Sequence, residues 1–377
     1  MSNYSKLGQF DPEYAAIVAA LPPPPPPEKQ RDHSCLREQF NVRVVGMTKD
    51  TLRPHLPPGW IVGNVELDDY YLRIICVEFQ IAVINVEYRL APEHPFPIGL
   101  NDCYAALKWV PYSRGCDLNL TQLTFSQTVS NQTLFGGDIS RGFLIGGQSS
   151  GGNYAAVLTH RARDDPFFEN RRLSGTALQI PIVLHPKAYP DKYKGELLSM
   201  EEYRDTSPSL NGERVEAFWA DLGAEPLNPE CSPFLYPSHA GLPPTYLQVC
   251  GRDPLRDEAL VYERLLKEDN VPTRLDVYPG VGHGFHVYYP TLTAAVKLDA
   301  DLKAGLSNLA VQGSCRDLRS SDRGISKKRG AFDWFSPKRW AAEAGLYTWG
   351  DKGRLCVLVH VQLVRAQHAD AAPGAGK

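Results

Sequence analysis

The amino-acid sequence predicts an α/β fold in which helices cover both faces of a mostly parallel central sheet. Apolar runs with strand character alternate with segments of helical spacing from residue 61 to about residue 310. Such alternation is typical of parallel strands joined by crossover helices. The length of 377 residues allows one large domain or two smaller ones, each with a full core.

The composition limits the kinds of molecule that the protein is expected to bind. Hydrophobic residues make up 43% of the chain and charged residues 22%, as expected for a globular protein. The formal net charge is −3 and the isoelectric point is near 6.4, so we expect no nucleic acid and no anionic membrane surface as partner. No apolar run has the length of a membrane span, and the first residues lack the pattern of a signal peptide. A cytoplasmic location is therefore expected.

The cysteines give no sign of a metal site. Eight of them are scattered along the chain without a C-x-x-C pair. This spacing argues against a zinc site and against a dense disulfide framework, and reduced thiols are the expected state.

The expected elements begin with a short helix. That helix, at 12–21, leads to six consecutive prolines at 22–27, which should form stiff polyproline II. We interpret the prolines as a rigid spacer, with docking to an SH3 or WW domain as the alternative. The strands expected in the domain are 81–86, 143–146, 178–184, 245–250 and 274–278, and the helices are 101–110, 152–163 and 257–267.

Two segments depart from the alternation of strands and helices. Residues 118–135 are polar and rich in Thr, Ser, Asn and Gln, which is typical of an exposed loop. Residues 311–377 are first basic and then rich in Gly and Ala. We expect this tail to be disordered or unrelated to the fold, although 355–364 could form one strand.

The strongest chemical motif is GGQSSGGN at residues 146–153. It contains Gly147-Gln-Ser149-Ser-Gly151, which matches G-x-S-x-G between a predicted strand and a predicted helix. A nucleophile on such a turn adopts a strained backbone, and small neighbours allow the chain to turn. A Gly/Ser-rich loop without chemistry is the plain alternative. The flanking strand and helix favour Ser149 as a nucleophile at the carboxyl edge of the sheet.

A nucleophilic serine needs a base, and the base needs an acid that orients it. Asp253 follows the predicted strand TYLQVC, and His283 follows the predicted strand RLDVY in a Gly-rich turn. Both residues are therefore expected at the same sheet edge as Ser149. Their order along the chain, Ser then Asp then His, is the order that accompanies a nucleophile on a strand-to-helix turn.

Three other residues compete for the acid and base roles. Asp257 falls inside a predicted helix and Asp276 within a predicted strand, so neither should emerge at that edge. His286 lies beyond the Gly-flanked turn. We therefore expect Asp253 and His283 rather than these alternatives.

Three stretches together resemble the hormone-sensitive-lipase-like branch of the α/β-hydrolase fold family, a branch of carboxylesterases and lipase-like enzymes. They are EYRLAPEHPFP at 87–97, the GGQSSGGN turn, and CGRDPLRDE together with GVGHGFH. They cover roughly residues 59–310. The branch usually has G-D-S-A-G-G-N at the turn, so Gln148 and Ser150 are modest departures.

The resemblance implies Ser149 as nucleophile, His283 as general base and acid, and Asp253 as the partner of His283. It implies neither a metal nor an organic cofactor.

The resemblance also implies a domain plan. A hydrolase domain would span 41–310, and a cap over the acyl pocket would come from residues 1–40 and from an insertion at about 187–230. The insertion contains aromatic residues that could wall an apolar pocket or pack in the core: Tyr189, Tyr193, Tyr203, Phe218 and Trp219.

The oxyanion site is where the chain departs most from the family. One donor should be the backbone N–H of Ser150, next to the nucleophile. The family's His-Gly-Gly-Gly-Trp motif supplies the others, and matching it on Gly59 and Trp60 places Pro57 and Pro58 on the two leading glycines. Because proline has no N–H, only Gly59 remains as a further oxyanion residue. The early strands of the fold are also expected to be incomplete, since no apolar run leads into this motif.

The sequence therefore predicts a serine carboxylic-ester hydrolase that acts on small or medium acyl esters through an acyl-enzyme on Ser149. Its partner would be a small-molecule ester, and a homo-oligomer is left open. The alternative is a hydrolase-fold protein without esterase activity, either a ligand-binding or dehydratase-type relative or a chain inactive for want of the oxyanion motif. A third hypothesis is a faulty gene model that skips coding sequence before Gly59. A transcript that encodes PHLPPGW unchanged would contradict that hypothesis.

Overall fold

The computed structural model describes residues 4–21, 66–79, 81–111, 137–207, 209–313 and 356–361. Some expectations fall outside these residues, namely those for the proline run at 22–27, the loop at 118–135, and Pro57, Pro58 and Gly59.

A six-stranded sheet forms the centre of the described structure, and all its strand pairs are parallel. The strand order is β1-β6-β2-β3-β4-β5. The strands are β1 (Ile81–Val86), β2 (Phe143–Gln148), β3 (Gly175–Gln179), β4 (Thr245–Arg252), β5 (Thr273–Gly282) and β6 (Cys356–Val361).

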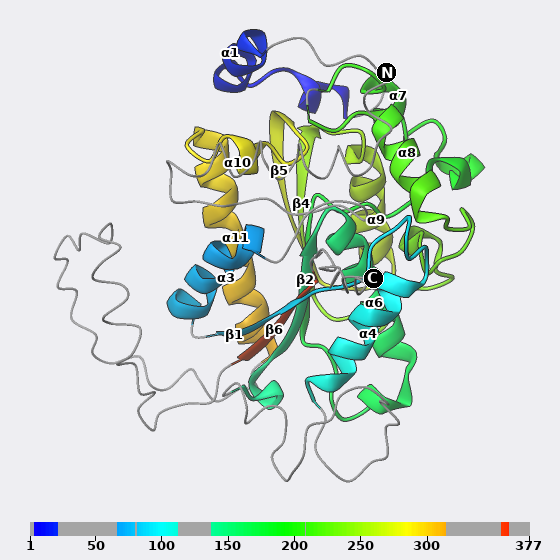
Figure 1. Cartoon of the computed structure of the whole chain (residues 1–377), viewed down its shortest axis with the longest axis vertical. Coiled ribbons are helices and arrows are strands. Elements are labelled where there is room, and N and C mark those ends of the chain that lie inside the picture. The colour runs from blue at the N-terminus through cyan, green and yellow to red at the C-terminus, as the bar shows by residue number, and fades with distance from the viewer. Residues whose placement is uncertain are drawn as a thin grey trace, which may run out of the picture.

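Helices cover both faces of this sheet (Figure 1), so the predicted fold class is confirmed. On one face lie α3 (Glu66–Phe79) and α11 (Thr293–Gly313), whose leucine and isoleucine side chains share a small apolar cluster. The other face carries α4 (Ile98–Trp109), α6 (Ser150–Asp164) and α9 (Arg256–Glu268). Strands β2, β3 and β4 are accordingly buried on both faces, which explains why they show no alternation of apolar and polar residues.

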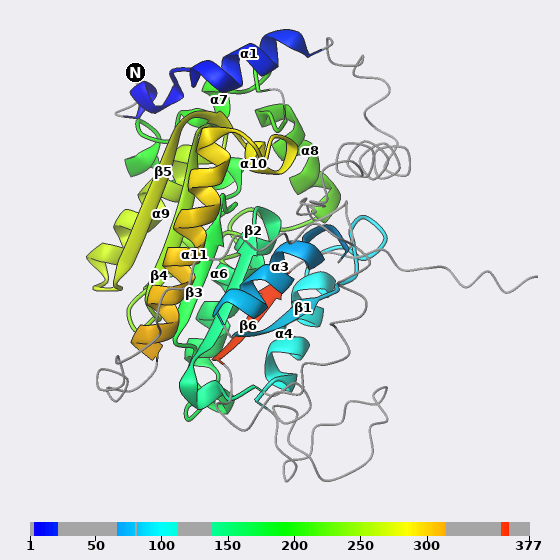
Figure 2. The ribbon, with the colours of Figure 1, turned by 90° about the vertical axis from the view of Figure 1, so that its left-hand side faces the viewer.

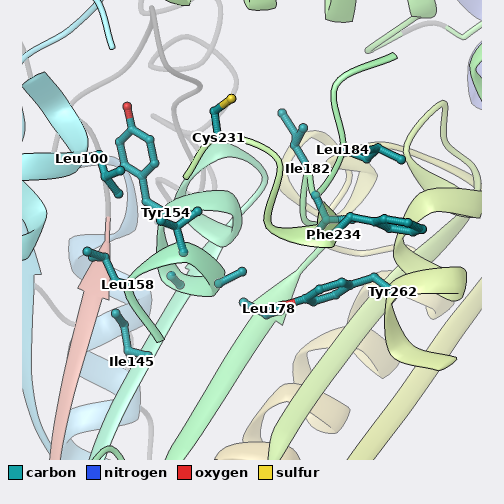
Figure 3. Packing of buried hydrophobic residues seen from close by; sticks show 14 of the residues in the cluster. Leu100, Ile145, Tyr154, Leu158, Leu178, Ile182, Leu184, Cys231, Phe234 and Tyr262 are labelled. Atoms are coloured by element: carbon teal, nitrogen blue, oxygen red, sulfur yellow. The ribbon is translucent and has the colours of Figure 1, made fainter. Parts of the chain in front are cut away.

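The main core lies between the sheet and the α6 face. Figure 3 shows Ile145 of β2, Leu158 of α6 and Leu178 of β3 in this cluster, together with Ile182 and Phe234 from the loops above the sheet. These five side chains are at most 4% exposed. Burial of this kind contributes about 1.5–3 kcal/mol per large apolar side chain, so it anchors both α6 and the loops at the carboxyl edge.

Strand β6 corrects part of the expectation for the tail. Residues 311–377 were expected to lie outside the fold, yet Cys356–Val361 pairs with β1 on one side and β2 on the other. The short apolar run at 355–364 does form a strand, since a gap between β1 and β2 would leave the inner edges of both without hydrogen-bond partners. Helix α11 also continues to Gly313, slightly beyond the expected end of the domain.

Strand β3 lies earlier in the chain than the apolar run at 178–184 predicts, since it spans Gly175–Gln179 and overlaps that run only at 178–179. It ends at Gln179, because Ile180 has a positive φ of 39° and Pro181 has no N–H to continue the ladder. The apolar run continues because the following loop is itself buried. A buried loop and a buried strand have the same composition, so the pattern could not separate them.

Four shorter helices lie at the carboxyl edge of the sheet. They are α1 (Pro12–Ala20), α7 (Ser199–Glu202), α8 (Gly212–Leu222) and α10 (Phe285–Tyr288). Figure 2 shows α1 crossing this edge above β5 and α10. No helix among the described residues combines the length and the apolarity needed to cross a bilayer.

A buried histidine pair should make the fold sensitive to acid. His160 Nδ1 lies 2.9 Å from the Ala156 carbonyl, and its Nε2 lies 3.0 Å from His239 Nδ1. Burial lowers the pKa of His160 to about 3 and the pKa of His239 to about 4. Between those values and pH 6.5 the unfolded chain binds protons that the folded chain does not, so stability falls as pH decreases.

We expect the free energy of unfolding to drop by about 2 kcal/mol for each of these histidines between pH 7 and pH 5. Urea unfolding at several pH values measures the drop. Little change from these groups is expected between pH 7 and 8, where both states are neutral. The variant His160→Gln should have a shallower dependence, and a dependence as steep as that of the wild type would contradict the assignment.

Candidate active site

Ser149 lies on a sharp turn between β2 and α6. Its backbone has φ 55° and ψ −115°, a conformation that residues with a side chain rarely adopt. The turn is held by hydrogen bonds from the Ser149 N–H to the Gln179 carbonyl (2.8 Å) and from the Asn153 N–H to the Ser149 carbonyl (3.0 Å). Although Ser149 occupies the N-cap position of α6, its hydroxyl does not cap the helix. The hydroxyl is therefore available to another partner.

Two glycines let the chain make this turn. A Cβ on Gly147 would lie 2.3 Å from the Gly151 carbonyl oxygen, which is too close for two non-bonded atoms. A Cβ on Gly152 would lie 3.0 Å from the Cβ of Pro181 in the loop after β3. The glycines of the sequence motif thus allow the first turn of α6 to pack directly against β2 and that loop.

The structure brings Ser149, His283 and Asp253 together in one chain of hydrogen bonds. His283 Nε2 lies 2.9 Å from Ser149 Oγ, and His283 Nδ1 lies 2.7 Å from Asp253 Oδ2. An ionised carboxylate can only accept, so Nδ1 carries the proton and donates it to Asp253. Nε2 is then left to accept from the serine hydroxyl. This arrangement makes the imidazole a base that faces the serine.

The three side chains are well shielded from solvent. Asp253 is 1% exposed, Ser149 is 9% exposed and the His283 side chain is 12% exposed. The other oxygen of Asp253, Oδ1, accepts the Leu255 N–H at 2.9 Å, which fixes the plane of the carboxylate. The His283 carbonyl accepts the Ser209 hydroxyl at 2.6 Å. Both sides of the His283–Asp253 bond are therefore positioned by the surrounding protein.

The competing residues have other partners. Asp257 is buried in the first turn of α9, where it pairs with Arg256 and accepts the N–H groups of Leu198 and Ser199. Asp276 lies in β5 and pairs with Arg274. Neither carboxylate belongs to the hydrogen-bond chain of Ser149.

His286, the competing base, lies on α10 and likewise stands outside the hydrogen-bond chain of Ser149.

Glu258 is a buried acid beside this site that the sequence did not reveal. It is 2% exposed, and its Oε1 accepts the N–H groups of Val183 (2.8 Å) and Leu184 (3.2 Å). Burial raises its pKa well above the usual value for a glutamate. It ties α9 to the loop after β3. In the sequence, Glu258 follows Asp257 at the start of a predicted helix, where exposed acids are common. The pattern therefore gives no sign that Glu258 is buried.

The predicted oxyanion residues are only partly described. Ser150 is the first residue of α6 and is fully buried. The N–H groups of a helix's first turn point towards its amino end, and here that is the side on which Ser149 lies. Gly59, like Pro57 and Pro58, lies outside the described residues. Among the described residues, no group of three or more His, Cys, Asp or Glu side chains could hold a metal ion.

The aromatic residues of the insertion at 187–230 are mainly packing residues. Tyr193 and Trp219 belong to the main core cluster, and Tyr189 and Phe218 pack against it. Tyr203 is 2% exposed. Of the two interpretations that the sequence left open, these contacts favour core packing.

Comparison with known proteins finds matches over most of the described chain. A family model described as alpha/beta hydrolase fold matches residues 58–287. An AB hydrolase superfamily protein of Schizosaccharomyces pombe is 35% identical over 252 residues, which cover 66% of this chain and 68% of that protein. Carboxylesterase NlhH of Mycobacterium tuberculosis is 30% identical over 284 residues, which cover 69% and 78%. The crystal structure of Vibralactone Cyclase is 34% identical, with a TM-score of 0.70, over 82% of this chain and 97% of that chain.

The turn at Ser149 should not tolerate a methyl group at Gly147. We expect Gly147→Ala to destabilise the protein by about 1–3 kcal/mol, as overpacking usually does, and to displace Ser149. Urea unfolding measures the first effect, and labelling of Ser149 with a fluorophosphonate measures the second. Gly195→Ala is the control, because a Cβ there meets nothing within 4 Å. Normal labelling of Gly147→Ala would contradict this view of the turn.

Proposed function

This chain belongs to the alpha/beta hydrolase fold family, in its hormone-sensitive-lipase-like branch, and we propose that it is a serine carboxylesterase. Its substrates would be esters of small or medium acyl groups. The observation that carries the proposal is the continuous hydrogen-bond chain from Ser149 Oγ through His283 to Asp253. The carboxylesterase and esterase names of its relatives support the same reaction class.

The first half of the proposed reaction forms an acyl-enzyme. His283 Nε2 takes the hydroxyl proton as Ser149 Oγ attacks the ester carbonyl carbon, and the carbonyl oxygen becomes an oxyanion. When the tetrahedral intermediate collapses, the bond to the alcohol breaks and His283 gives its proton to the leaving oxygen. Asp253 stays ionised and stabilises the imidazolium between these two steps.

The second half returns the enzyme to its starting state. A water molecule loses a proton to His283 and attacks the acyl carbon, and the carboxylic acid leaves as Ser149 Oγ takes the proton back. The low exposure of all three side chains strengthens the electrostatic part of both halves, because charges interact more strongly away from water.

The oxyanion needs donors that are in place before the reaction. We assign one to the N–H of Ser150, which lies at the positive end of α6. Gly59 is the remaining residue of the family motif that could give a second. Each lost donor lowers the rate by roughly 10²–10³, so the prolines at 57 and 58 predict a slow member of the family rather than a different reaction.

A second candidate reaction is ring closure on the same acyl-enzyme. The structural relative named Vibralactone Cyclase matches this chain over 97% of its own length, and a lactone is a cyclic ester. In this version a hydroxyl group of the acyl chain itself, instead of water, attacks the acyl carbon. That hydroxyl loses its proton to His283, and the lactone leaves as Ser149 regains its proton. The shielding of the triad from solvent favours such an internal nucleophile.

The esterase proposal predicts turnover of short p-nitrophenyl esters by the full chain. Ser149→Ala should lower the rate roughly 10⁴-fold or more, because the residual binding site cannot replace the nucleophile. Ser140→Ala, at an exposed serine before β2, is the matched control and should keep full activity. A folded wild type without turnover would favour the ligand-binding or dehydratase-type alternative. Turnover that survives Ser149→Ala would rule out the triad.

The ring-closure candidate is tested with an ester whose acyl chain carries a hydroxyl group, in water enriched with heavy oxygen. Hydrolysis inserts the heavy oxygen into the acid, whereas ring closure gives an unlabelled lactone. We expect some unlabelled lactone with the wild type and none with Ser149→Ala. Product that consists only of labelled acid would leave hydrolysis as the sole reaction.

A further inference from the structure

An N-terminal strap crosses the carboxyl edge of the sheet above the site. The strap, residues 4–21, consists of the 3₁₀ turn η1 (Ser5–Gly8), the helix α1 and the residues that join them. Figures 1 and 2 both show it lying over the ends of β4 and β5, the strands that lead to Asp253 and His283. Glu13 anchors the strap on α11, where its carboxylate accepts the N–H (3.0 Å) and the hydroxyl (2.9 Å) of Thr293.

The strap holds the acid loop through Arg252. By acid loop we mean residues 251–255, the end of β4 and the residues that follow it. The Arg252 guanidinium donates to the Gly8 carbonyl at 2.6 Å and lies 3.5 Å from the centre of the Phe10 ring. The strap backbone also passes so close that a Cβ on Gly251 would lie 2.1 Å from the Leu7 carbonyl oxygen. The residue directly before Asp253 is therefore fixed to a segment far away in the sequence.

The same strap holds the base loop. By base loop we mean residues 280–285, from the end of β5 to the start of α10. The Asp11 N–H donates to the Gly280 carbonyl at 3.2 Å, and Gly280, with φ 77°, has no room for a Cβ beside the strap. Tyr14 is 1% exposed and packs edge-on against Phe285, with ring centres 6.4 Å apart. Its hydroxyl lies against the Gly282 backbone, next to His283.

The sheet joins these two loops only through an irregular part of its ladder. The register between β4 and β5 shifts between Cys250 and Arg252, so the regular ladder is interrupted just before Asp253. A shift of this kind bends the strands and turns side chains away from their regular directions. The strap contacts both strands at this shift and adds a second link between them, beside the ladder pair of Arg252 with Gly282.

We propose that Arg252 is a positioning residue, which locks the strap to the acid loop and so keeps Asp253 and His283 at hydrogen-bonding distance. The proposal rests on the function proposed above, because it assigns the strap a part in activating Ser149. It differs from a cap that only covers the acyl pocket. A cap would act on substrate binding, whereas this clamp acts on the base. Loosening it lowers the rate of chemistry for every ester alike.

The test measures kcat and KM of the full chain for a short and a medium p-nitrophenyl ester. Arg252→Met keeps the apolar stem but loses the charge and the donor. We expect its kcat to fall about tenfold for both esters, since small displacements of reacting groups cost one to two powers of ten. KM should change less than about twofold, because the contacts that bind the substrate and the transition state equally well are unchanged. Arg252→Lys keeps a charge and a donor and should recover most of the loss.

Arg274→Met is the matched control. Arg274 also lies over a ring, 5.0 Å from the centre of Tyr246, and pairs with Asp276, but it is in β5 away from the strap. The Arg274→Met variant should lose a similar contact and keep the wild-type kcat. An Arg252→Met variant with unchanged kcat, or with only an ester-dependent change in KM, would overturn the clamp in favour of a cap.

A second measurement separates this proposal from the proposed function. The Nδ1 proton of His283, held between the ring and Asp253, should give a downfield proton resonance that needs no turnover. If the wild type hydrolyses no ester, the esterase proposal fails. The clamp is still supported when Arg252→Met weakens this resonance and Arg274→Met does not, and it is overturned when the resonance is unchanged.

Phe10→Leu covers the case in which Arg252→Met does not fold. Phe10 is 43% exposed, so its loss should leave the fold intact. Removing the ring beneath Arg252 should lower kcat about two- to fivefold, the usual worth of an exposed cation–ring contact. An unchanged kcat in this variant would count against the clamp.

Discussion

The backbone conformation of Ser149 is the constraint on which the site depends. A positive φ at a residue with a side chain costs about 1–3 kcal/mol and persists only where the surrounding structure imposes it. Here the packing of β2, α6 and the loop after β3 imposes it, since glycine contacts leave no other path for the chain. Once Ser149 points out of the sheet edge, the base must come from a neighbouring loop at that edge. The ends of β4 and β5 are where the chain supplies Asp253 and His283.

The acid loop and the start of α9 connect this site to the rest of the molecule. Arg252 binds the strap, Asp253 binds His283, Arg256 pairs with Glu202, and Asp257 accepts the N–H groups at the start of α7. Arg256 and Asp257 both hold α7, so these four residues tie three other segments to the stretch RDPLRDE. One short stretch therefore links the site to other parts of the molecule, and it is among the three stretches that carry the resemblance to the family.

The sequence predicts the triad because strand ends can be read from local patterns. Asp253 and His283 follow strands of the same parallel sheet, so topology alone brings them to one edge. A contact between two residues that lie far apart in the sequence leaves no such local pattern. Nothing near Arg252 indicates that it binds Gly8, and the end of β3 is hidden because the loop after it is as apolar as the strand. The insertion of Cys356–Val361 between β1 and β2 was missed for the same reason.

The place of β6 has a consequence for how the molecule is made. Strands β1 and β2 are synthesised well before β6, the strand that joins them. Until then each carries an unpaired inner edge, the kind of edge that pairs readily with other chains. The centre of the sheet can therefore close only after β3, β4 and β5 have also been synthesised. A chain cut before residue 356 would lose a strand from the middle of the sheet and not from its rim.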